Sequence, residues 1–317
     1  MTSDKIKKFK QFLHGSGYLF SEDDFASDSR KNRLKTDLVK NGKQYVGYLL
    51  LDSGYKTIFF NEMSALSELN KLNFSHGPKL VDYSENEGWM IREKITGDTA
   101  GDVYRIDKKN LSIDHFSDSL VEVLMFFATM NPKDGDNVTA QSLTNYLKTK
   151  IDLDDPENGQ IAELIIKLCD NIGLNEKNIE EKDMQVFLHG DMQPTNLITD
   201  AEKNVFVVDF EKAGRGNLLF DFASLYHRGE DNPSWQRSFM RKYIKALESI
   251  KLNFDEKAFD LFHMYYLALD VVSLQVVYLK NTGDLKPFRS TNLDKKEASR
   301  LHDLYLEILS NKLKSIQ

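Results

Sequence analysis

The sequence predicts an α+β fold in two parts: a small antiparallel sheet over residues 1–95 and a larger, mainly helical part over residues 96–317. Three observations support this prediction. The chain has 317 residues, enough for two ordinary domains. Alternating apolar runs flank Asn41-Gly42, the strongest short signal for a β-hairpin. After Gly97, apolar residues recur at helical spacing in successive segments.

The N-terminal part contains the predicted strands. Its short runs of β-branched and aromatic residues are bounded by turn residues, which is typical of strands. We expect an amphipathic helix at 5–14, strands at 34–40, 44–51 and about 56–60, a helix at 61–72 that begins at Asn61 as N-cap, and strands at 80–83 and 88–94.

The C-terminal part is predicted to be helical, with one embedded segment of strands. Helices are expected at 113–130, 142–151, 161–172, 233–250, 255–279 and 293–313. The segment that interrupts them begins with the apolar run at 186–188 and contains most of the residues suited to chemistry.

Residues 196–208 are predicted to form a short hairpin beside two acidic residues. If Thr199 pairs with Val205, then Asn196 lies opposite Val208, one residue before Asp209. Paired strands lie about 5 Å apart, so the side-chain oxygens of Asn196 and Asp209 can reach one hard cation. Asp191, on the turn before the hairpin, can then face a substrate. This layout suits phosphoryl transfer, which needs a metal beside a carboxylate that orients a hydroxyl.

Composition excludes several classes of protein. The chain carries 42 basic and 49 acidic residues, a formal net charge of −7, without a long basic block, so a nucleic-acid partner is disfavoured. Cys169 is the single cysteine, which excludes an intrachain disulfide and a thiolate zinc cluster. Neither a signal peptide nor an apolar window of membrane-spanning length is evident. We therefore expect a cytoplasmic protein without a membrane partner.

Several motifs around Asp191 resemble a known family. They are His189-Gly190-Asp191, Asn196, Val208-Asp-Phe-Glu211 and Leu218-Leu-Phe-Asp-Phe-Ala223. At these spacings they resemble the catalytic segment of the aminoglycoside phosphotransferase and choline kinase families, small-molecule relatives of protein kinases. The resemblance implies a two-lobed, protein kinase-like fold, with a nucleotide-binding lobe at 1–95 and a catalytic and substrate-binding lobe at 96–317.

The resemblance also implies a reaction and its catalytic residues. Asp191 corresponds to the catalytic base, and Asn196 and Asp209 correspond to the residues that hold Mg²⁺. The expected activity transfers the γ-phosphate of ATP, or of another nucleoside triphosphate, to a hydroxyl of a small molecule similar to an aminoglycoside, choline or a sugar. ATP is thus a co-substrate and Mg²⁺ a cofactor, and the expected state is a monomer or homodimer.

On the nucleotide side the resemblance is less complete. Glu62 lies where related folds place the acid that pairs with a strand lysine, although it can equally be a carboxylate favoured by a helix N-terminus. Glu93 and Ile95 lie where hinge main-chain groups bond adenine. However, Tyr48 occupies the position where the family usually has the lysine.

Other residues can replace the missing groups. The candidates for the lysine are Lys35, Lys43 and Lys56, and we take Lys56 as the nucleotide-binding one. The expected phosphate loop, 27–32, has no glycine, but a serine hydroxyl such as that of Ser29 can still bind phosphate.

Three further points follow from these motifs. We interpret His189 and Asp221 as residues that hold the loop, with Gly190 permitting a tight turn, although a catalytic role for His189 stays open. Because the departures fall on the nucleotide side, a pseudokinase that acts as a nucleotide- or ligand-binding module is an alternative. A metallophosphoesterase that uses His189, Asp191 and Asp209 is a second alternative.

Overall fold

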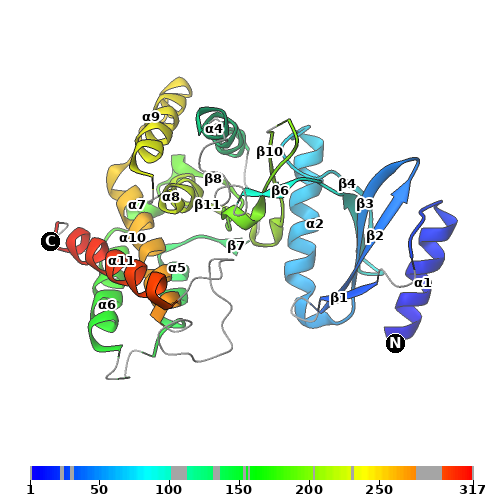
Figure 1. Ribbon diagram of the computed structural model, residues 1–317, viewed down its shortest axis with the longest axis horizontal. Helices are drawn as coiled ribbons and strands as arrows, with labels where there is room; N and C mark the ends of the chain where they lie inside the picture. The colour runs from blue at the N-terminus through cyan, green and yellow to red at the C-terminus, as the bar shows by residue number, and fades with distance from the viewer. Residues whose placement is uncertain are drawn as a thin grey trace. The chain divides into compact units, whose positions relative to one another are not determined.

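The chain is described by a computed structural model, which covers residues 2–21, 25–28, 32–100, 113–130, 136–152, 155, 158–202, 204–229, 232–275 and 295–315. The chain divides into two compact units (Figure 1). The sheet unit consists of Met1–Val103 and Asn196–Ala213, and the helical unit of Tyr104–Thr195 and Gly214–Gln317. The predicted division between residues 95 and 96 stays a prediction.

The main sheet of the sheet unit is antiparallel. Its strands are β1 (Ala26–Asp28), β2 (Arg33–Lys40), β3 (Lys43–Leu50), β4 (Leu80–Ser84) and β5 (Trp89–Glu93), in the order β1-β2-β3-β5-β4. The tight turn between β2 and β3 is the predicted hairpin turn, because both Asn41 and Gly42 have positive φ, at 53° and 74°. A positive φ at both central residues matches the twist of the flanking strands.

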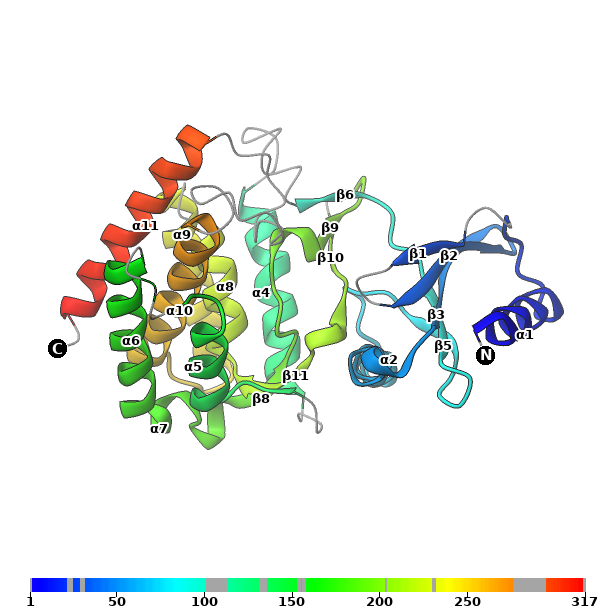
Figure 2. The same cartoon turned by 90° about the horizontal axis from the view of Figure 1, so that it is seen from below.

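One helix covers each face of this sheet (Figures 1 and 2). On one face, α1 (Thr2–Gly15) packs Phe9 and Leu13 against Leu38, Leu49 and Ile91, as predicted for an amphipathic helix on the outside. On the other face lies α2 (Lys56–Lys71), whose Glu62 contacts side chains of β2 and β5. Successive strand residues point to opposite faces, so β3 contributes buried side chains to both layers.

The predicted strand at 56–60 is wrong, because α2 already begins at Lys56. The run Thr57–Phe60 has strand-favouring residues, but Phe59 continues the helical spacing of Met63 and Leu66, all three of which are buried. Burial of that continuous face outweighs local propensity. Consequently Asn61 is not an N-cap but lies within the helix.

A smaller sheet in the sheet unit contains the predicted metal-binding hairpin. Its strands are β6 (Asp98–Thr99), β9 (Leu197–Thr199) and β10 (Val205–Val207), in the order β10-β9-β6. Thr199 pairs with Val205, and the Val208 N–H donates to the Asn196 carbonyl at 2.9 Å, which confirms the predicted register. His76 fixes the hairpin, since its ring contacts the Val205 carbonyl and its own carbonyl accepts from Val207 N–H.

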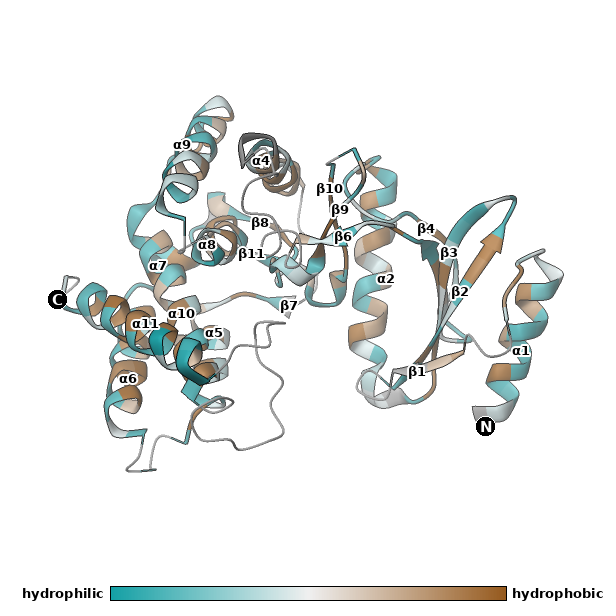
Figure 3. Cartoon of the chain, in the orientation of Figure 1, coloured by the Kyte–Doolittle hydropathy of each residue, from teal (hydrophilic) through white to brown (hydrophobic). Residues whose placement is uncertain are grey.

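The helical unit is built around α10 (Glu256–Leu274), which is buried along most of its length and packs against α6, α8 and α11. Hydrophobic and hydrophilic bands alternate along the outer helices (Figure 3). The other helices are α4 (Ile113–Thr129), α5 (Ala140–Lys148), α6 (Gly159–Leu174), α7 (Glu176–Ile179), α8 (Leu219–Arg228), α9 (Pro233–Ser249) and α11 (Lys295–Ser315). Within the described residues the predicted helices are confirmed, with ends shifted by a few residues; residues 276–279 and 293–294 of the last two predicted helices lie outside the described ranges.

No helix in the described ranges is both long and apolar enough to cross a membrane.

A third sheet lies within the helical unit, formed by β7 (Asp136–Asn137), β11 (Gly214–Asn217) and β8 (Gln185–Leu188) in that order. Its strand β8 leads directly into His189 and Asp191.

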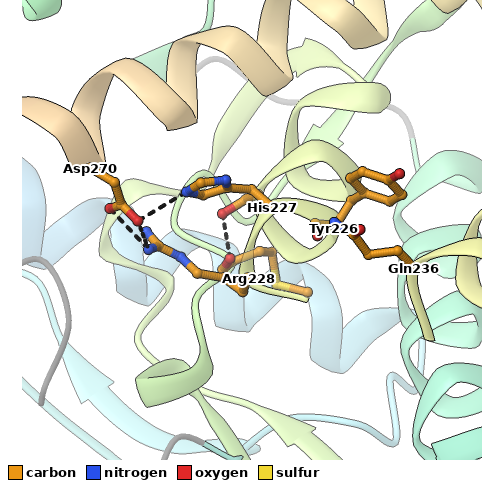
Figure 4. A network of polar contacts seen from close by, with 7 residues as sticks. Tyr226, His227, Arg228, Gln236 and Asp270 are labelled. Carbon is orange, nitrogen blue, oxygen red and sulfur yellow. Dashed lines mark hydrogen bonds and ion pairs between the residues drawn. The ribbon is translucent and has the colours of Figure 1, made fainter. Parts of the chain in front are cut away.

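A buried ion cluster joins α8 to α10 (Figure 4). The Asp270 carboxylate accepts two hydrogen bonds from Arg228 Nη1, at 3.0 and 2.8 Å, and lies 2.9 Å from Nε2 of His227. The side chains of His227, Asp270 and Arg228 are 0%, 2% and 8% exposed. Charges this deeply buried are tolerated only when they are paired.

Candidate active site

The loop after β8 is held by one buried carboxylate. Asp221, in the first turn of α8, accepts hydrogen bonds from the main-chain N–H of His189 at 2.7 Å and of Gly190 at 3.1 Å. Gly190 has a φ of 76°, in the left-handed region that favours glycine. The predicted roles of Asp221 as a brace and of Gly190 as a turn residue are thus confirmed.

The same loop fixes the surroundings of Asp191. Its main-chain N–H donates to Nδ1 of His189 at 3.2 Å, so this nitrogen of the buried ring acts as an acceptor. Gln193 donates to Oδ2 of Asp191 at 3.2 Å, and Ser224 donates to the Met192 carbonyl at 2.6 Å. These contacts agree with the loop-orienting interpretation of His189, and they leave Asp191 partly exposed.

We predict that Asp221 makes stability depend on pH. Burial raises the pKa of its carboxyl from 3.8 to about 7, against the two main-chain N–H groups, which lower it. A raised pKa means that the folded state binds the proton more tightly. The contribution of Asp221 to the free energy of unfolding is therefore largest below about pH 4, falls by about 4 kcal/mol between pH 4 and pH 7, and is constant above.

Urea unfolding of the native chain and of Asp221→Asn, at several pH values from about 5 to 8, measures this contribution as their difference. The matched control is Asp255→Asn, because Asp255 also accepts two main-chain N–H groups, at the start of α10, but is only half-buried. A difference for Asp221 that rises with pH over this range would contradict the prediction.

The two predicted metal ligands belong to the sheet unit. Asn196 ends a single turn of 3₁₀ helix (Pro194–Asn196), and the residue is 6% exposed. Asp209 follows β10 with φ 70° and ψ 59°, a left-handed conformation that is costly for a residue with a side chain. Because such strain persists only where the surroundings impose it and often marks functional sites, it supports a special role for Asp209.

The turn that follows Asp209 is held by α2 and by the segment after it. Asn61 donates from its side-chain amide to the carbonyls of Glu211 at 2.9 Å and Ala213 at 2.6 Å. Phe210 packs edge-on against Phe74, with ring centroids 6.4 Å apart. The turn that begins at Asp209 is thereby fixed to the helix that carries Glu62.

The donor chemistry of Asn196 and Asp209 fits Mg²⁺. An amide and a carboxylate are hard oxygen ligands, and Mg²⁺ at phosphate sites is commonly held by one or two protein groups, with phosphate and water completing its shell. The structure, in the ranges it describes, has no cluster of three or more His, Cys, Asp or Glu side chains arranged for a metal. An amide and a carboxylate together suit a metal whose remaining ligands are phosphate and water.

Glu62 is paired with arginines. Its Oε2 accepts from Nη1 of Arg33 at 3.1 Å, and its Oε1 lies 3.7 Å from Nε of Arg92. Tyr48 lies under both guanidinium groups, with centroid distances of 4.4 Å to Arg33 and 5.3 Å to Arg92. The Tyr48 hydroxyl also accepts from Arg92 Nη2 at 2.9 Å. We call these four residues the Glu62 cluster.

Sequence reasoning missed both arginines in this cluster. Arg33 begins β2 and Arg92 lies near the end of β5, so a lysine search in β3 could not find them. The available signal was the position itself: Arg92 directly follows three consecutive apolar residues, Trp89 to Ile91, all of which are buried. A charged residue at such a position needs a partner.

The other residues predicted to bind the nucleotide lie in different elements of the sheet unit. Lys56 is exposed at the start of α2, with its Nζ 5.5 Å from the Phe60 ring centroid, so its predicted strand position is wrong. Lys35 and Lys43 are also exposed. The Glu93 N–H donates to the Lys79 carbonyl at 2.9 Å, and Ile95 lies two residues after the end of β5. Ser29 lies outside the described residues.

The comparisons with known proteins identify the family. The model of the phosphotransferase enzyme family (APH) matches residues 60–252, more than half of the chain. The chain belongs to this family. No curated protein matches the chain at a significant level. The match includes Asp191, Asn196 and Asp209, and it confirms the resemblance on which their roles were predicted.

Solved structures confirm the predicted α+β, kinase-like fold. Choline kinase LicA from Streptococcus pneumoniae is similar with a TM-score of 0.61 and 14% identity, over 99% of this chain and 100% of that one. Aminoglycoside phosphotransferase APH(4)-Ia gives 0.57 and 11%, over 99% of both chains. A thermostable mutant of the latter, in a ternary complex with ADP and hygromycin B, gives 0.56 and 12%, over 96% of this chain and 97% of that one.

Proposed function

We propose that this phosphotransferase-family chain is an ATP- and Mg²⁺-dependent kinase of a small molecule, and that it transfers the γ-phosphate to a hydroxyl. The observation that carries the proposal is the family match across residues 60–252, which spans the predicted base and both predicted metal ligands. The structural relative with ADP and hygromycin B gives a precedent for a nucleotide and a small hydroxylated compound on this fold.

Each proposed residue has a separate chemical role. Asp191 orients the acceptor hydroxyl and takes its proton, and the contacts of Gln193 and His189 hold its position before substrate binds. Asn196 and Asp209 hold Mg²⁺, which supplies positive charge against the phosphate oxygens. Phosphoryl transfer through a loose transition state depends on the positioning of the reactants and on charge rather than on covalent chemistry by the protein. The loop that carries Asp191 is held by the buried Asp221 carboxylate, which provides that positioning.

The proposal defines the phosphate acceptor by its chemical class and not as a single compound. The structural neighbours suggest choline-like amino alcohols and aminoglycosides, and the sequence resemblance adds sugars; all of these offer a hydroxyl for Asp191. The net charge of −7 is compatible with a cationic acceptor. The acceptor is therefore a question for a panel of compounds.

The test uses γ-labelled ATP with a panel of choline-like, aminoglycoside and sugar alcohols. We expect label on at least one acceptor with Mg²⁺ present, and its loss when a chelator removes the metal. Binding of ADP without transfer to any acceptor, or to water, would contradict the kinase assignment and favour a nucleotide-binding module. Binding of neither ATP nor ADP would contradict both.

A further inference from the structure

The loop that carries Asp191 is attached to α8 on both sides of this residue. Before it, two main-chain N–H groups donate to the Asp221 carboxylate. After it, the Ser224 hydroxyl donates to the Met192 carbonyl at 2.6 Å. Asp221 and Ser224 stand at positions i and i+3 of α8, so their side chains lie on the same face of the helix. One face of α8 therefore holds the chain both before and after Asp191.

The hydrogen bond from Ser224 lies in the interior of the helical unit. Ser224 is 3% exposed and Met192 is 0% exposed. A buried carbonyl that loses its donor carries the full cost of its desolvation, so the main chain shifts if another partner can be reached. Because Asp191 directly precedes Met192, such a shift displaces the carboxylate proposed to take the proton of the acceptor.

Tyr266 of α10 supports this serine. Burial raises the pKa of its hydroxyl well above the ordinary value, Asp221 and Tyr265 raise it further, and a hydrogen bond with Ser224 lowers it. The Tyr266 ring also packs against Phe220 of α8, with ring centroids 5.3 Å apart. The serine that holds the loop is thus itself held where α8 packs against α10.

We propose that Ser224 is a positioning residue for phosphoryl transfer. Its hydroxyl, supported by Tyr266, fixes the main chain after Asp191 and thereby the direction in which that carboxylate faces the acceptor hydroxyl. The Asp221 brace bonds only residues before Asp191, so it does not by itself fix the chain that follows. This inference rests on the proposed function, because it concerns the base of that same reaction.

A purely structural role for Ser224 makes a different prediction. If its hydroxyl only stabilises the packing of the loop on α8, its removal lowers activity by the same factor whether or not the Asp191 carboxylate is present. If it acts through Asp191, its removal has no further effect once that carboxylate has been replaced. A double-mutant cycle with Asp191→Asn separates the two interpretations.

The experiment measures kcat and the KM for ATP on the full chain, with labelled ATP and the best acceptor of the panel. We expect Ser224→Ala to lower kcat about 10-fold, because a small displacement of a reacting group is costly, and to change the KM for ATP less than about twofold. In the Asp191→Asn background the same change should alter kcat less than about twofold. Ser224→Cys, which keeps a weak donor at nearly the same size, should lose less than Ser224→Ala but in the same direction.

The matched control is Thr144→Val, which also removes a buried hydroxyl that donates to a main-chain carbonyl in the helical unit. Thr144 of α5 is 8% exposed and donates to the Gln141 carbonyl of its own helix at 3.0 Å, so kcat should be unchanged. An equal loss from Ser224→Ala in both backgrounds, or no loss in the native background, would overturn the inference and leave the proposed kinase intact. A native chain that labels no acceptor would overturn the proposed function and the inference with it.

Discussion

Replacing Asp191 with asparagine lowers kcat by about 10²- to 10⁴-fold once an acceptor is known, the range for loss of a general base. The amide keeps the shape of the side chain and can still accept from Gln193, so the loop is expected to stay in place. What is lost is the carboxylate that we propose orients the hydroxyl and takes its proton. Since neither role involves the nucleotide, the KM for ATP should change only a few-fold.

Steady-state transfer from labelled ATP gives both constants. Asp170→Asn is the matched control, because it makes the same chemical change at an exposed position of α6 in the same unit and should leave kcat unchanged. Full activity of Asp191→Asn would remove Asp191 from the mechanism. A loss of ADP affinity together with kcat would instead indicate a disturbed fold.

Replacing Asp270 with alanine should destabilise the chain by about 3–5 kcal/mol, the usual cost of removing one partner from a buried ion pair. Asp270 accepts from Arg228 twice and contacts His227, in the network drawn in Figure 4. Without the carboxylate, the guanidinium of Arg228, 8% exposed, stays buried without its counter-charge. Chemical denaturation of the native and variant chains measures the difference.

Two further variants test the cause of this loss. Asp260→Asn, on the same helix, breaks a pair with Lys312 whose side chains are 40% and 28% exposed, so it should cost less than about 1 kcal/mol. The double variant Asp270→Leu with Arg228→Met removes both charges and should recover much of the stability. A double variant no more stable than Asp270→Ala would indicate that packing, and not charge, dominates at this position.

The local sequence pattern predicted helices, strands and turns correctly where only one spacing of apolar residues fitted the segment. The Asn41-Gly42 turn and the Thr199–Val205 register were correct because turn chemistry and strand alternation act over a few residues. The strand predicted at 56–60 was wrong because aromatic and β-branched residues favour a strand locally. The buried face shared with Met63 and Leu66 instead required a helix.

The partners of polar and charged side chains could not be predicted from local sequence pattern. Asn61 was expected to cap a helix, but its amide binds carbonyls 150 and 152 residues away in sequence. Asp270 lies in an otherwise apolar stretch of α10 and is paired with residues 42 and 43 positions earlier. The spacing of residues in one segment holds no information on which distant side chain will face it.

By itself, the sequence determined most of the helical and strand segments, the family and the candidate residues Asp191, Asn196 and Asp209, because these depend on motifs and periods within short stretches. Only the tertiary structure decided that arginines and not a lysine accompany Glu62. The physical reason is that the partner of a buried charge is chosen when sheet and helix faces pack, where desolvation makes pairing obligatory.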